Sequence, residues 1–349
     1  MKKALKLFFE FLLLVFLLIC LVWHKLVIYG LEQGEGQLEL VWNARPVEDV
    51  LKDPSFPDSL KLKLNLITEI KQYTIDSLGM EPSENYTRVY DQKNQAVLFT
   101  VSGCEPFAFK PKEWRFPVLG TVPYVGFFNK EKARKEVLKL KAEGYDVDIY
   151  SPSGWSTLGW FRDPILSNML KQNERSIANL IIHELTHGTL FIKNDVNFNE
   201  NLANFIGDKG AERFLIMKYG KDSKQHEDYI QNKVDEKIYD DYILKGAERL
   251  DSLYKRMMDD EETDLVRKEK KKKMIMEIVV GVNRLPLYKK KNYFNYTLQA
   301  FHEGNAFFMS FTRYDSQYDF FESEYKRLYN SDLKKYMIAM KEKYPSIDR

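Results

Sequence analysis

The chain has 349 residues, and its 53 lysines and arginines nearly balance its 51 aspartates and glutamates, which leaves a formal net charge of +2. Because these charges are distributed along the sequence, they exclude a broad basic surface of the kind that binds nucleic acid, and we expect no nucleic-acid partner. Hydrophobic residues make up 44% of the chain, which is enough for a substantial core. No linker rich in proline, glycine or serine divides the sequence, so we expect one N-terminal anchor and one body.

An apolar stretch over residues 7–29 predicts one N-terminal transmembrane helix, because its length approaches the roughly 20 residues that span a bilayer. Glu10 is the only charge within residues 8–23, the most apolar part of this stretch. No cleavage site with small residues follows the run, and Ile19 stands where a lipoprotein signal would place a small residue before Cys20. We therefore expect an uncleaved anchor. Cys20 lies inside the apolar stretch, where Cys104 of the body could not easily reach it. We therefore predict no structural disulfide.

The charges that flank the apolar stretch predict its orientation. Lys2, Lys3 and Lys6 place residues 1–6 in the cytoplasm, because short cytoplasmic segments carry an excess of basic residues. Residues 30–349 then form a body on the outer side of the membrane.

The first part of the body, residues 30–175, predicts a small sheet with helices. Apolar residues at helical spacing predict a helical piece broken by Pro46 and helices over 59–78 and 131–143. Alternating patterns predict a hairpin of 87–90 with 96–101 and a strand over 146–150. A small sheet thus precedes the rest of the body.

The remainder of the body is predicted to be helical. Residues 176–220 have the pattern of two helices joined by a short loop at 194–199. Further helices are expected within residues 221–349, over 226–256, 262–279, 296–313 and 319–341. The basic run 267–273 follows a group of acids and is interpreted as a solvated helix face.

An H-E-x-x-H motif, formed by His183, Glu184 and His187, lies in the first helix of the pair. Residues four apart share one face of a helix, so both imidazoles can bind one metal ion. Two imidazoles and a carboxylate leave a position on zinc for water, and Glu184 can accept the proton of that water as a general base. The competing interpretation is a pair of core histidines without a metal, which would bury two imidazoles at considerable cost.

The third ligand is to be chosen among Asp195, Glu200 and His226. Leu190 and Lys193 stand where a metzincin-type site needs glycine and histidine, so that class is excluded. Glu200 begins the second helix in a segment that resembles the N-E-x-x-A element of gluzincin peptidases, and it is our choice. The main competitor is Asp195, although a carboxylate there could equally serve the turn. Asn204, one turn after Glu200, is a candidate to orient a ligand.

Several stretches across the body match a known family. They are Gly36–Leu40 with Arg45–Pro46, Phe116–Gly120 with Pro123–Tyr124, Ser156–Phe161 with Asp163–Pro164, the H-E-x-x-H motif, Phe198–Glu200, Asn305–Ala306 and Tyr314. In these residues the chain resembles the putative aminopeptidase family of bacterial envelope proteins. The resemblance implies a zinc metallopeptidase on the periplasmic side of a bacterial cell membrane. Many members of the family have a lipid-modified cysteine in place of an anchor, a pattern from which Cys20 departs.

Other residues are candidates for binding the substrate. A donor opposite the zinc would stabilise the oxyanion of the transition state, and Tyr314 is the leading candidate, followed by His302 and His226. The strand over 146–150 precedes the motif helix, as does the edge strand that pairs with an extended peptide in gluzincins. The aromatic rings of Trp155 and Trp160 could wall a side-chain pocket or pack on the core.

Taken together, these patterns predict an α+β fold, a mostly helical zincin-like metallopeptidase domain with a small sheet behind one transmembrane helix. The expected activity is that of a peptidase, an aminopeptidase by resemblance, with one Zn²⁺ ion on His183, His187 and Glu200. Glu184 would act as the base and Tyr314 as the oxyanion donor on a peptide or protein substrate. The alternative is a non-catalytic envelope scaffold whose metal is structural or absent.

Overall fold

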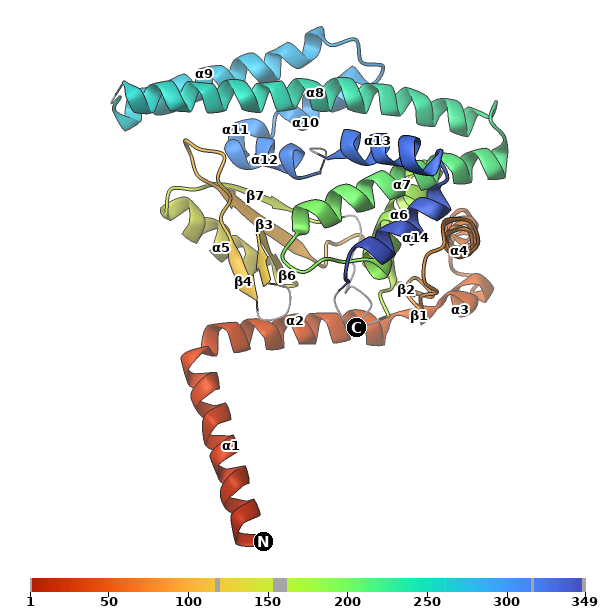
Figure 1. Ribbon diagram of the computed structural model, residues 1–349, viewed down its shortest axis with the longest axis vertical. Helices are drawn as coiled ribbons and strands as arrows, with labels where there is room; N and C mark the ends of the chain where they lie inside the picture. Colours follow the sequence, from red (N-terminus) through yellow and green to blue (C-terminus); the bar gives the residue numbers. More distant parts are fainter. Residues whose placement is uncertain (1, 117–119, 153–161, 261, 315–316, 347–349) are drawn as a thin grey trace.

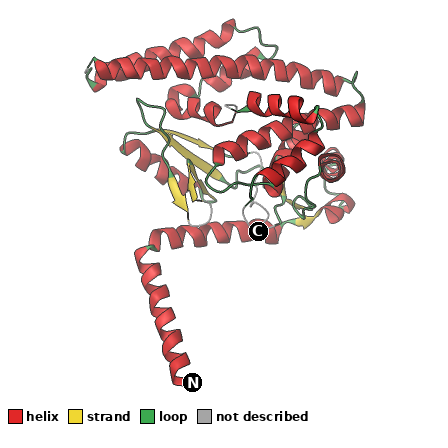
Figure 2. Cartoon of the chain, viewed as in Figure 1, coloured by secondary structure: helices red, strands yellow, loops and turns green. Residues whose placement is uncertain are grey.

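The computed structural model describes residues 2–116, 120–152, 162–260, 262–314 and 317–346 of the chain. Helices make up most of this part, and the strands gather in small sheets to one side of them (Figure 2). The predicted α+β class with a small sheet and a mostly helical body is therefore confirmed.

Two helices begin the chain. Helix α1 (Lys2–Val22) projects away from the body, and α2 (His24–Asn43) runs along the body's edge (Figure 1). The junction is Trp23, whose backbone angles of φ −107° and ψ 27° leave the helical range. The structure therefore does not support the single helix predicted over residues 7–29, because two helices share that range. Within the described residues, no helix has both the length and the apolar character that a membrane span requires.

Helix α2 is held to the body by aromatic packing. The hydroxyl of Tyr29 donates a hydrogen bond of 2.9 Å to the carbonyl of Gly126, and its ring lies 5.6 Å from the ring of Phe116. Gly36 touches the side chain of Phe128 so closely that a Cβ at this position would come within 2.2 Å of the ring. The glycine therefore lets the helix approach the sheet.

Three sets of strands lie between α2 and the helices. The antiparallel sheet β6–β3–β7 consists of β6 (Tyr124–Phe127), β3 (Phe99–Cys104) and β7 (Asp146–Tyr150), and helix α5 (Lys130–Ala142) packs on it. In the register of β3 and β7, Thr100 lies opposite Tyr150 and Cys104 opposite Asp146. A second sheet joins β1 (Arg45–Pro46), β2 (Arg88–Tyr90) and β8 (Ile165–Leu166), and β4 (Trp114–Phe116) pairs with β5 (Gly120–Val122).

The hairpin predicted from residues 87–90 and 96–101 is wrong. Strand β2 pairs with β1 and β8, whereas β3 pairs with β6 and β7. The physical reason is that the two strands belong to different cores: Val89 of β2 packs in the main helical core, and Val101 of β3 packs in the core beneath α5. Alternation along the sequence indicates a strand but does not identify its partner.

The main core surrounds one central helix pair. Helix α6 (Glu174–Thr189) packs along α7 (Val196–Tyr219), and α4 (Asp58–Leu78) covers α6. Side chains also enter this core from α3 (Val47–Lys52), α13 (Tyr318–Tyr329), α14 (Leu333–Lys343), the short η1 (Met169–Lys171) and the strands β2 and β8. The predicted helix pair within residues 176–220 is thus present, and it lies in the middle of the molecule.

The C-terminal helices form a second core above the sheet (Figure 1). They are α8 (Lys224–Asp259), α9 (Asp264–Gly281), η2 (Val282–Arg284), α10 (Lys290–Thr297), α11 (Ala300–Glu303) and α12 (Asn305–Tyr314). The helices predicted over 296–313 and 319–341 are each interrupted. The breaks fall at Gly304 and Asn330, whose positive φ angles of 54° and 48° end a right-handed helix.

Most residues of the basic run 267–273, which lies in α9, are exposed, but Lys271 is buried. The interpretation of this run as a solvated helix face is therefore wrong for Lys271. Its ammonium donates to the carbonyl of Pro106 at 2.8 Å and pairs with Asp146 of β7. The same carboxylate accepts a hydrogen bond of 2.6 Å from the backbone of Asn305. Asp146 therefore joins the sheet to two of the C-terminal helices.

Candidate metal centre

Helix α6 presents the H-E-x-x-H motif at its C-terminal end. Its start is fixed by Asn173, whose side chain accepts a hydrogen bond of 2.9 Å from the backbone of Ser176. The segment Ile177–Ile182 packs largely into the main core. The motif therefore begins on a helix whose direction is set by burial, and His183, Glu184 and His187 occupy its last two turns.

Helix α7 brings Glu200 to the same place. Asp195 caps the helix by accepting a hydrogen bond of 3.0 Å from the backbone of Phe198, so this carboxylate serves the turn. The buried amide of Asn199 binds both backbone groups of Ile192, at 2.8 and 2.7 Å, which fixes the loop between the helices. Glu200 follows directly after the first turn of α7 and faces α6.

Three side chains converge between the two helices. Nε2 of His183 lies 3.1 Å from Nε2 of His187, and these nitrogens lie 3.5 and 3.7 Å from Oε2 of Glu200. Their possible ligand atoms all lie within 4.8 Å of one another. The side chains are 13%, 7% and 12% exposed, so water has little access to them.

These separations fit a metal ion. Ligands at about 2.1 Å from a tetrahedral zinc ion lie about 3.4 Å apart, which is close to the three separations found here. The donor set of two imidazoles and one carboxylate is the set found in catalytic zinc sites that keep a fourth position for water. His183, His187 and Glu200 are therefore able to hold one such ion.

The pKa values of the site reflect these close contacts. Burial alone would lower the pKa of His183, but its hydrogen bond with Glu200, the nearby carboxylate charges and a hydrogen bond with Asn204 together raise it. Burial would raise the pKa of Glu200, but His187 and His183 hold it well below its usual range. Asn204 thus contacts a histidine of the group, in the position expected of a residue that orients a ligand.

Glu184 differs from Glu200 in its surroundings. Burial raises its pKa, and the two histidines only partly oppose this effect. The charge of Glu184 also contributes to the raised pKa of Tyr86, whose hydroxyl is deeply buried. Tyr86 has a left-handed φ of 60°, a strained conformation for an aromatic residue. Nothing in the sequence pattern had singled out this tyrosine.

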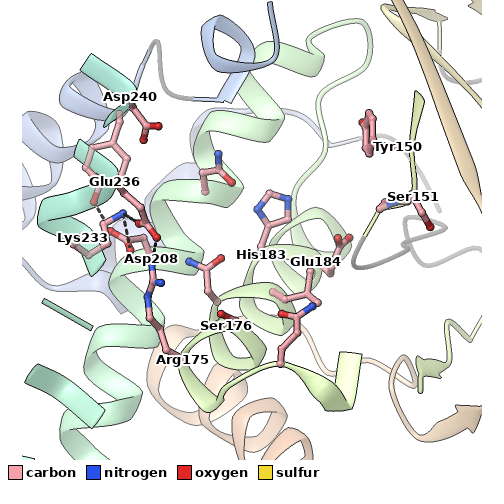
Figure 3. Close-up of a pocket in the computed structure, with 16 residues that line it drawn as sticks. Tyr150, Ser151, Arg175, Ser176, His183, Glu184, Asp208, Lys233, Glu236 and Asp240 are labelled. Atoms are coloured by element: carbon pink, nitrogen blue, oxygen red, sulfur yellow. Dashed lines mark hydrogen bonds and ion pairs between the residues drawn. The ribbon is translucent and has the colours of Figure 1, made fainter. Parts of the chain in front are cut away.

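A pocket of about 540 Å³ opens beside His183 and Glu184. One side is formed by Tyr150, Ser151 and Pro152 at the end of β7, which is an edge strand of its sheet. The opposite side consists of charged residues from α6, α7 and α8 (Figure 3). They are Arg175, Asp208, Lys233, Glu236 and Asp240. This charged wall was not predicted, because its residues stand far apart in the sequence among many other charges.

The other predicted site residues lie elsewhere. His302 is exposed on α11, and His226 is buried near the start of α8, where Nδ1 donates to the carbonyl of Lys221 at 2.6 Å. Neither histidine belongs to the three-residue group in the described part of the chain. Tyr314 ends α12, but its side chain lies outside what the structure describes, and so do Trp155 and residues 156–161, which include Trp160.

Comparison with protein families matches residues 28–344 to a family model described as "Putative aminopeptidase". The match includes the helix pair, the pocket and all of the described C-terminal helices. No curated protein and no solved structure matched the chain.

Proposed function

Since the chain belongs to the family of putative aminopeptidases, we propose that it is a zinc-dependent peptidase whose single Zn²⁺ ion is held by His183, His187 and Glu200. The observation that carries the proposal is the convergence of these three side chains, with separations of 3.1, 3.5 and 3.7 Å between their ligand atoms. The site is of the gluzincin type, because its third ligand is a glutamate from the helix that follows the motif.

The metal and the protein have separate tasks in this mechanism. A bound zinc ion would lower the pKa of a water molecule toward about 7 and polarise the carbonyl of the scissile peptide bond. Glu184 accepts the proton of the attacking water and can pass it to the leaving amine.

The rest of the pocket positions the substrate. Strand β7 lies at the edge of its sheet and ends at Tyr150, which lines the pocket. An extended peptide can pair with such an edge through its backbone, so that recognition does not depend on one side chain. We propose that the peptide enters along β7. Its scissile bond would then have His183 and Glu184 on one side and the charged wall on the other. The oxyanion donor remains a prediction for Tyr314.

The experiment that tests the zinc dependence is removal and restoration of the metal. Dialysis of the full chain against a chelator should abolish hydrolysis of a peptide library, and one equivalent of Zn²⁺ should restore it. Unchanged hydrolysis by metal-free protein would overturn the proposal. A folded protein that binds zinc but cleaves no peptide would instead support the scaffold alternative.

We also propose that the protein is attached to a bacterial cell membrane with its body on the outer side. The support is the exposure of large apolar side chains along α1, among them Phe8, Phe9 and Phe11, each more than half exposed. Replacing these three residues with serine should move the protein from the membrane fraction to the soluble fraction. An unchanged distribution would contradict the attachment.

A further inference from the structure

Helix α2 exposes a stripe of apolar side chains. This apolar stripe consists of Ile28, Leu31, Leu38 and Trp42, which follow one another after three, seven and four residues. Such spacing places the four side chains along one face of a helix. Leu31 is 69% exposed and Trp42 is 79% exposed, so most of the surface of these side chains is open to solvent.

The apolar stripe lies opposite the face by which α2 packs on the body. Gly36 and Leu40 are buried on that packed face, and Tyr29 donates its hydrogen bond to Gly126 from the same side of the helix. A helix that is apolar on opposite faces is typically covered on both of them. Since the body covers only one face of α2, the apolar stripe requires a second apolar partner.

Two features identify this partner as a lipid membrane. First, Trp23 alone joins α2 to α1, whose exposed phenyl rings support the proposed attachment, and α1 leaves α2 on the side away from the body (Figure 1). Second, exposed tryptophans stand at both ends of α2, at Trp23 and Trp42. Because indole rings favour the level of the lipid headgroups, the two rings are suited to a helix that lies along a membrane surface.

Glu35 argues against a second copy of the chain as the partner. It lies on the same face as the apolar stripe, midway between Ile28 and Trp42. In a two-fold contact the Glu35 carboxylates of both copies would come together at its centre, where two like charges repel each other. At a membrane surface the carboxylate can remain among headgroups and water while the apolar side chains enter the lipid.

We propose that the apolar stripe of α2 lies in the interface of a phospholipid membrane, with the helix parallel to the membrane surface. The inference rests on the proposed membrane attachment and adds a second contact to that of α1. Amphipathic helices of this kind bury their apolar face about 5–10 Å into the boundary between headgroups and acyl chains. The contact holds the body against the membrane, and it needs no anionic lipid, because the exposed face of α2 carries an acid.

The test uses the full chain on phosphatidylcholine vesicles whose acyl chains carry bromine atoms close to the headgroups. Bromine quenches tryptophan fluorescence at short range, so the ring of Trp42 reports its own contact with the lipid. The difference between the fluorescence of wild type and that of Trp42→Phe isolates the emission of this ring. On brominated vesicles, this emission should fall by at least about half.

Two matched variants test whether the apolar stripe makes this contact. Leu31→Asp places a charge in the stripe and should reduce the quenching of Trp42 at least about twofold, because a carboxylate favours water. Leu138 of α5 is 68% exposed but lies outside the stripe, so Leu138→Asp should leave the quenching unchanged. Equal effects of the two substitutions would overturn the inference.

The same experiment separates this inference from the proposed attachment. Wild type that binds the vesicles while Trp42 stays unquenched would overturn the inference and leave the attachment by α1 intact. Wild type that does not bind the vesicles would overturn both. Unquenched Trp42 together with a dimer in solution that Leu31→Asp dissociates would assign the apolar stripe to a second copy of the chain and so overturn the lipid contact.

Discussion

Gly207 of α7 lies directly against His183 of α6: a Cβ built on the glycine would come within 3.2 Å of the Cβ of the histidine and 3.1 Å of the carbonyl of Asn179. Contacts of this length are tighter than those of ordinary side chains, and one of the two atoms is backbone. The two helices therefore approach each other closely at the histidine because the facing residue has no side chain.

Gly207→Ala should force α7 away from α6 and so separate Glu200 from the histidines. We expect a loss of about 1–3 kcal/mol in the free energy of unfolding and a weaker zinc affinity. Gly188→Ala is the control, because a Cβ there meets nothing within 4 Å and alanine is the better helix former. Urea unfolding and zinc titration measure both effects. Equal behaviour of the two variants would show that close approach at His183 is unnecessary.

The third metal ligand can be tested by comparing two carboxylates. Glu200→Ala removes a group that lies within 3.5 and 3.7 Å of the two histidines, and zinc binding should be lost. Asp195→Ala removes a helix cap and should cost about 1 kcal/mol of stability while zinc remains bound. Metal analysis of the purified variants distinguishes them. The opposite pattern would make Asp195 the ligand.

The buried pair of Lys271 and Asp146 predicts an effect far from the site. Lys271→Ala would leave the carboxylate of Asp146 in a largely buried place without its cation, and we expect a loss of about 3–5 kcal/mol in the free energy of unfolding. Lys272→Ala changes an exposed residue of the same run and should cost less than about 0.5 kcal/mol. Chemical denaturation of both variants provides the measurement, and similar losses would contradict the special position of Lys271.

Glu303 of α11 predicts a dependence of stability on pH. Burial, together with the charge and the hydrogen bond of Asp148, raises the pKa of Glu303 from 4.5 to about 8, and Lys141 only partly opposes this. A carboxyl group with a raised pKa stabilises the fold while it is protonated. Its contribution is therefore complete below about pH 4.5 and is lost as the pH rises through about 8.

Glu303→Gln should remove this loss. Relative to wild type, the variant should gain about 1 kcal/mol in unfolding free energy between pH 5 and pH 9, a modest value because solvent screens a half-buried pair. Glu143→Gln, an exposed change at the end of α5, should leave the pH profile of wild type unaltered. Parallel profiles for wild type and Glu303→Gln would refute the proposed titration.

Local patterns predicted the elements of this fold better than their partners. The apolar spacing around His183 and the cap before Phe198 are local features, and they indicated both helices of the central pair. The pairing of β2 depends instead on β8, which follows it by more than 70 residues. The breaks at Gly304 and Asn330 depend on two backbone angles that a continuous apolar pattern conceals.

The candidate site shows the same division. His183, Glu184 and His187 are recognisable because four residues make one turn of a helix, and Glu200 because it follows in the next helix. Asp240 comes from another helix, 56 positions after Glu184, and in the sequence it is one of several neighbouring acids. Only packing of α6, α7 and α8 around one pocket distinguishes it from adjacent acids, such as Asp241, that do not line this pocket.

Glu184→Gln gives the most direct test of zinc-dependent peptide hydrolysis. Glutamine has nearly the same shape but cannot accept the proton of the attacking water. Turnover of a peptide with a free N-terminus should therefore fall at least about 100-fold. Zinc content and the free energy of unfolding should stay close to those of wild type, because Glu184 is not one of the three converging ligands. Equal turnover by zinc-loaded wild type and Glu184→Gln would contradict the peptidase mechanism.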